Sequence, residues 1–202
     1  MSLFHYEGPI NRIGTVIADI IILSIIWILF SIPLFTIGAS STALYYVCTR
    51  RISDKEGYLF KDFWKSFRAN FFKSSLLWLL GLVLTGFIFL NLHLIVNLEL
   101  RSDLRTALIA VQLAIFFELL ITSLYLYPII ARFEMAYSQT IKSAFFMANR
   151  HILTSIAIAA LAIFIVLAAM AIWPIFLVGM GLYAYITSHI FMHIFKKYKP
   201  EI

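Results

Sequence analysis

The sequence predicts an all-α protein, a polytopic bundle of transmembrane helices accompanied by cytoplasmic amphipathic helices. Hydrophobic residues make up 62% of the 202 residues and charged residues only 13%, whereas soluble domains are nearer half apolar and a quarter charged. The apolar residues fall in runs about as long as the 20 residues that a helix needs to cross a bilayer. We therefore expect one integral membrane domain over residues 1–202, with five long spans and one short helix at 38–49.

The first span is predicted at 13–35, where Asp19 is the only charge and Pro33 marks the far end. The small, turn-prone residues 36–42 follow, and their Ser and Thr side chains are suited to capping a helix. A helix over 38–49 would be only about 18 Å long, short of the roughly 30 Å hydrocarbon core. It could be a thin crossing, a re-entrant half-helix or a surface piece, and we favour a crossing.

The longest polar run, residues 50–73, is predicted to be a basic amphipathic segment in the cytoplasm. Its aromatic residues recur at the spacing of one helix face, and its cations Lys61, Lys65 and Arg68 occupy other faces. A helix of this kind lies at the membrane interface or packs on another surface. That surface could be lipid, the protein's own spans or a partner. The aromatic row consists of Phe60, Phe63, Trp64, Phe67 and Phe71.

Four further spans are predicted in the rest of the chain. Tyr127-Pro128 is expected to close the second of them, and Pro174 to separate the last two. The closing span contains Gly179 and Gly181, which would permit close helix contact. The four spans are 74–96, 106–130, 152–173 and 175–195.

The distribution of lysine and arginine predicts the orientation. Segments 50–73, 132–151 and 196–202 hold 13 of the 16 Lys and Arg residues. By the positive-inside rule these segments face the cytoplasm, together with the C-terminus. If the helix at 38–49 crosses, the N-terminus is cytoplasmic too. Because the basic residues cluster at the ends of spans, we attribute the net charge of +6 to membrane topology and to contact with anionic lipid. We predict no binding of nucleic acid.

Ionisable residues inside spans are costly and prompt a functional hypothesis. Asp19 and Glu118 are the candidates, and Arg132 could pair with either. We favour a role as fasteners between helices, with ion or substrate coordination as the alternative. No catalytic motif, cofactor site or metal site is predicted, because the single Cys48 excludes multi-cysteine sites and His189 and His193 lack a neighbouring carboxylate.

Several motifs resemble the YesL family across nearly the whole chain. They are P33-L-F-T-I-G-A-S-S-T-A-L-Y-Y46, D54-K-E-G-Y-L-F-K-D-F-W-K-S-F-R-A-N-F71, Y127-P-I-I-A-R-F133 and G181-L-Y-A-Y-I-T-S-H-I-F-M-H-I-F-K-K-Y198. The resemblance implies a small protein of the bacterial cell membrane, often encoded beside carbohydrate import systems and presumed to assist them. It implies no catalytic residues.

Three functional hypotheses follow. The leading one is a non-enzymatic accessory or regulatory protein that assists a partner, such as an ABC-type sugar importer, with the aromatic row and its cations as the contact surface. The second is an autonomous transporter of small solutes or ions that uses Asp19 and Glu118. The third is a structural or lipid-interacting protein. The oligomeric state is left open.

Overall fold

The computed structural model describes residues 9–53, 57–98 and 101–198, and every regular element in that part of the chain is helical. The predicted all-α bundle is therefore confirmed for the described residues. The elements are α1 (Pro9–Ser31), the 3-10 helix η1 (Leu34–Thr36), α2 (Ile37–Ile52), α3 (Leu59–Asn97), α4 (Ser102–Arg132), α5 (Tyr137–Arg150), α6 (Ile152–Ala171) and α7 (Pro174–Lys196).

Five of these helices are long and apolar enough to cross a membrane, namely α1 from Gly14 onward, α3, α4, α6 and α7. They agree with the five long spans expected from the sequence. Pro174 occupies the first position of α7, where its missing N–H removes no helical hydrogen bond. Together the five helices fit a multi-pass membrane protein.

Two predicted helix boundaries are wrong. The basic segment 50–73 and the span 74–96 are not separate elements, because α3 runs unbroken through most of the first and all of the second. A helix of 39 residues is about 58 Å long, nearly twice the thickness of the hydrocarbon core. Pro128 does not close the preceding span either. It lies inside α4, which continues to Arg132.

The short helix α2 lies at the centre of the molecule rather than on its surface. Most of its residues between Gly38 and Cys48 are buried, and α1, α3, α4 and α7 all pack against it. Its small residues let the neighbouring helices approach closely. Thr42 Oγ1 lies 2.8 Å from Ser74 Oγ of α3, and Tyr45 Oη lies 3.1 Å from Thr187 Oγ1 of α7. Burial on all sides excludes a surface piece for this part of the chain.

A single serine joins α1 to α7. Ser24 is fully buried, accepts a hydrogen bond from the backbone N–H of Gly181 at 2.9 Å and donates to the carbonyl of Val178 at 3.0 Å. A Cβ at Gly181 would lie 2.5 Å from the backbone oxygen of Ile20, so only glycine permits this approach. The expected close contact at Gly181 is therefore confirmed.

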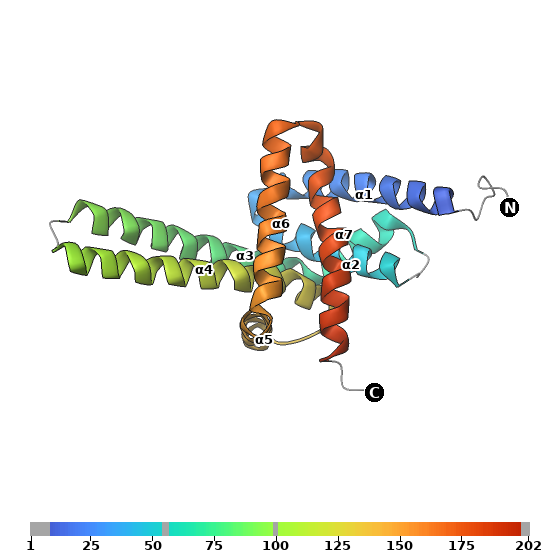
Figure 1. The fold of residues 1–202 in the computed structure, drawn as a ribbon. Helices are drawn as coiled ribbons and strands as arrows, with labels where there is room; N and C mark the ends of the chain where they lie inside the picture. The colour runs from blue at the N-terminus through green and yellow to red at the C-terminus, as the bar shows by residue number, and fades with distance from the viewer. Residues whose placement is uncertain (1–8, 54–56, 99–100, 199–202) are drawn as a thin grey trace.

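Two antiparallel hairpins, α3–α4 and α6–α7, give the molecule its shape (Figure 1). The α3–α4 hairpin extends away from the other helices, and apolar residues along it, such as Val83 and Phe87, are exposed. The α6–α7 hairpin runs crosswise to it, with α7 packed on α1 and α2. Transmembrane helices tilt by about 20° on average. In this arrangement, therefore, the two hairpins cannot both run along the normal of one flat bilayer.

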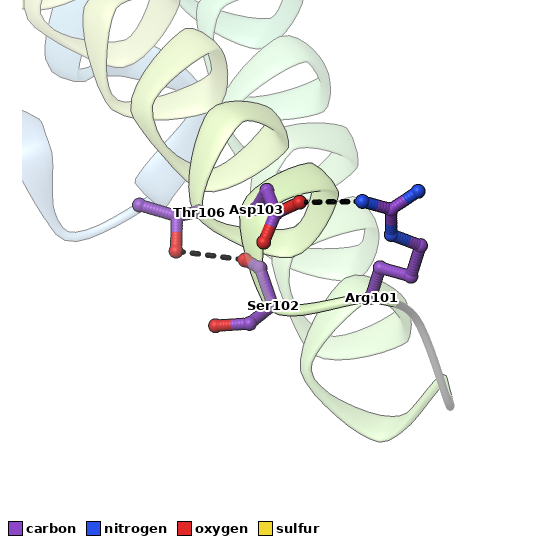
Figure 2. Close-up of polar contacts among 4 residues, drawn as sticks. All are labelled: Arg101, Ser102, Asp103 and Thr106. Atoms are coloured by element: carbon purple, nitrogen blue, oxygen red, sulfur yellow. Dashed lines mark hydrogen bonds and ion pairs between the residues drawn. The ribbon is translucent and has the colours of Figure 1, made fainter.

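Figure 2 shows the first turn of α4, at the far tip of the α3–α4 hairpin. Arg101 and Asp103 form an ion pair of 2.9 Å there, and the Thr106 hydroxyl donates to the Ser102 carbonyl. Both charged side chains are more than three-quarters exposed, and ion pairs this exposed contribute at most about 1 kcal/mol to stability. The tip is thus polar and solvated, as the connection between two spans should be.

Candidate functional site

Asp19 is paired with an arginine that the sequence analysis did not select. Its Oδ2 lies 2.7 Å from a guanidinium nitrogen of Arg51, at the C-terminal end of α2. The pair borders a small cavity of about 150 Å³, which Cys48 and Tyr185 also line. Arginine in the last turn of a helix is favoured by the helix dipole, and here it also neutralises a carboxylate that faces it from α1. Asp19 therefore ties α1 to α2.

The preceding arginine makes the equivalent contact on the other side of α2. Arg50 donates to Asp62 of α3 at 2.8 Å, and both side chains are at least two-thirds buried. A Cβ at Gly57 would lie 2.2 Å from the Asp62 carboxylate, so the glycine makes room for this pair. Arg50 and Arg51 together fasten the end of α2 to both of its neighbours.

Glu118 lies on α4 beside α5. Its Oε1 accepts a hydrogen bond from Asn149 at 2.6 Å and one from Thr122 at 3.3 Å. Next to it is an open groove of about 750 Å³ with almost wholly apolar walls, which Phe145, Phe146 and Lys142 help to line. The hydrogen bond from Asn149 therefore joins α4 to α5, and the role of Glu118 as a fastener between helices stays a prediction.

Arg132 pairs with neither carboxylate. Its guanidinium stacks over the ring of Phe195 at 5.9 Å and borders a polar cavity that Lys65 and Lys73 also line. Asp19, Glu118 and Arg132 each have their contacts in a different part of the molecule. The structure therefore does not gather the three residues of the predicted intramembrane site into one place.

The aromatic row packs largely against the protein itself. Phe30 of α1 lies among its first four members, with ring centroids 5.1–6.3 Å away. Phe63 and Phe67 are buried, whereas Phe60 and Trp64 remain exposed and Phe71 is half-buried. Of the three packing surfaces that the sequence left open, the protein's own spans account for the centre of the row. Its exposed edge continues into Lys61, Lys65 and Arg68, all of which are exposed.

The sequence analysis selected candidate site residues because they are ionisable and lie inside predicted spans. Several residues that make polar contacts between helices do not meet that criterion. Ser24 and Asn149 are uncharged and ordinary in composition, yet each joins two helices. Arg51 was counted toward topology, although its place at the end of a helix was a signal that it could reach a carboxylate on a neighbour. His189 packs its ring against Tyr185. The described residues contain no group of three or more His, Cys, Asp or Glu suited to a metal.

Residues 20–92 match the model of a family described as a protein of unknown function, DUF624. The match covers about half of α1, all of α2 and nearly all of α3. It therefore includes the aromatic row and the Arg50–Asp62 pair, but less than half of the chain. It is consistent with the resemblance to the YesL family, whose name itself stays a prediction. No curated protein and no solved structure matches the chain.

Proposed function

We propose that the protein is a non-enzymatic accessory subunit of the membrane that docks on a partner membrane protein through one face of α3. This docking face consists of the exposed residues Phe60, Lys61, Trp64, Lys65, Arg68 and Phe72. The observation that supports it is the division of one helix into two faces. The inward residues Phe63 and Phe67 are fixed on Phe30, so the outward residues are held on a rigid support.

The chemistry of the docking face indicates the partner's surface. Phe72 is 82% exposed and Phe60 56% exposed, and the Arg68 guanidinium lies 5.9 Å above the Trp64 ring. Aromatic and arginine side chains are the residues that most often anchor protein interfaces. Cations among them suit an acidic, partly apolar surface at the cytoplasmic side of the membrane. The resemblance to the YesL family supplies the proposed partner, an ABC-type importer of carbohydrates.

The hydrogen bonds of Asp19 and Glu118 favour this role over autonomous transport. Each carboxylate is already held by a side chain of a neighbouring helix, Arg51 and Asn149 respectively. A carboxylate that binds a transported ion must exchange such partners during the cycle. We therefore expect purified protein in liposomes to move no solute from a broad panel. Flux that Asp19→Asn abolishes in a correctly folded variant would establish transport instead.

Co-purification from native membranes tests docking. The variant Lys61→Gln with Arg68→Gln removes two exposed charges from the docking face, and should reduce recovery of the partner at least tenfold. The matched control, Lys196→Gln with Lys197→Gln, removes two exposed charges from another predicted cytoplasmic segment and should leave recovery unchanged. Equal recovery with both variants would refute docking through this face.

A further inference from the structure

A polar cavity lies between α3 and the connection from α4 to α5. It has a volume of about 600 Å³, enough for a small ester or a lipid headgroup. We call it the basic cavity. Its lining includes three cations, Lys65, Lys73 and Arg132, and a single carboxylate, Glu134. The formal charge around it is therefore positive by two.

We propose that the basic cavity binds a phosphate group, carried either by an anionic phospholipid or by a soluble phosphate ester. The first argument is that no ion pair among the described residues neutralises its cations. The ion pairs found among the described residues join Arg50 to Asp62, Arg51 to Asp19 and Arg101 to Asp103. None involves the three cations of the basic cavity. Cations that only determine the orientation of the spans in the membrane would not have to line the same cavity.

The second argument is that two of these cations, Lys73 and Arg132, are held in place. Lys73 Nζ donates to the Met135 carbonyl at 2.6 Å, which leaves two of its three protons for a ligand. The Arg132 guanidinium is fixed over the Phe195 ring. A planar guanidinium can donate two parallel hydrogen bonds to a phosphate. A site whose donors are already ordered loses less side-chain entropy when it binds.

The third argument comes from α5. Its first residues follow Ala136, which lines the basic cavity and offers no side-chain cap to the helix. The start of a helix presents free backbone N–H groups and the positive end of the dipole, both of which favour anions. The Gln139 carboxamide also lines the cavity and accepts the backbone N–H of Ala136 at 3.3 Å. Three side-chain cations and one helix start thus share one cavity.

The position of the cavity accounts for both sources of phosphate. Lys73 is followed at once by the apolar half of α3, and Arg132 ends α4. Both therefore lie where two predicted spans meet the cytoplasmic surface. Phospholipid headgroups occupy this level, and soluble phosphate esters reach it from the cytoplasm.

Binding to the purified full chain in detergent tests the proposal. The probes are dioctanoyl phosphatidylglycerol, glycerol 3-phosphate and inorganic phosphate, with dioctanoyl phosphatidylcholine as the zwitterionic control, titrated calorimetrically at physiological salt. Preference for phosphatidylglycerol assigns the site to lipid, and preference for the soluble probes assigns it to an ester or free phosphate. Either result supports a phosphate site. No binding of any anionic probe would overturn it.

Two variants locate the binding. Lys73→Gln with Arg132→Gln should weaken binding about tenfold or more, whereas Lys142→Gln with Lys196→Gln, an equal loss of charge elsewhere, should not. Gln139→Glu is the second variant, in case the first does not fold. This substitution keeps the size of the side chain and its contact with Ala136, and it adds a negative charge to the cavity. A negative charge near the N-terminus of α5 should also stabilise that helix. We expect weaker anion binding at an unchanged or higher melting temperature. If Gln139→Glu and the control bind equally well, the basic cavity is not the site.

Discussion

The close contact between α2 and α3 at Gly38 makes a quantitative prediction for Gly38→Ala. A Cβ at Gly38 would lie 2.3 Å from the backbone oxygen of Ser74 and 2.8 Å from Cβ of Trp78. Backbone atoms of α3 cannot turn aside as a flexible side chain would, so α3 must move away from α2 by about 1 Å to reach ordinary van der Waals contact. The hydroxyl contact of 2.8 Å between Thr42 and Ser74 would then stretch beyond hydrogen-bonding distance.

The expected loss of stability is the sum of two effects. Overpacking in a tightly packed interior costs about 1–3 kcal/mol, and a hydrogen bond between transmembrane helices contributes about 0.6–1.7 kcal/mol. Alanine regains up to about 1 kcal/mol through its higher helix propensity. We therefore expect Gly38→Ala to lower the free energy of unfolding by about 1–4 kcal/mol.

The matched control is the same substitution in α3. A Cβ at Gly86 meets nothing within 4 Å, so Gly86→Ala should leave stability unchanged or raise it slightly. Both variants would be compared with the wild-type protein in one detergent, by SDS-driven unfolding followed through tryptophan fluorescence. If Gly38→Ala is as stable as Gly86→Ala, the close approach of α2 and α3 does not hold the centre of the molecule together.

Three further predictions test other contacts in the molecule. Asp19→Asn and Arg51→Gln should each destabilise the protein, and the double variant should lose less than the sum, since both remove one ion pair; additive losses in a double-mutant cycle would contradict the pairing. Phe67→Ala should cost about 3–5 kcal/mol, whereas Phe72→Ala, at an 82% exposed position, should cost far less in the same assay. Desolvation, aided by Lys197 and Arg150, lowers the pKa of His151 below its usual 6.5. Stability should therefore fall as the pH drops below about 6.5, and His151→Gln should flatten that part of the melting-temperature profile.

Apolar length was enough to predict the five long apolar helices, although not all of their boundaries. The five long spans follow from run length, and the breaks at Pro33 and Pro174 follow from the missing N–H of proline. The unbroken course of α3 was missed because a change of composition at residue 73 looks like a boundary. A helix continues through such a change when no glycine or proline stops it, and none lies between Leu59 and Leu80.

The candidate site was harder to predict, because polar groups in a membrane bundle are satisfied by partners far along the chain. Asp19 and Glu118 were found as unusual charges. Their partners are harder to find, because Asn149 carries no signal of its pairing and Arg51 carries only that of its place at a helix end. The aromatic row was found by its spacing. Which members face inward depends on Phe30, a residue that nothing in the sequence connects to the row.

The three basic segments, predicted to share one side of the membrane, are joined by direct contacts. Lys65 and Lys73 of the first share the basic cavity with Arg132 of the second. Arg150 of the second stacks over Tyr198, and the His151 ring contacts the Tyr198 hydroxyl at 3.0 Å, which ties the second segment to the end of the chain. Segments in contact cannot lie on opposite faces of a bilayer about 30 Å thick.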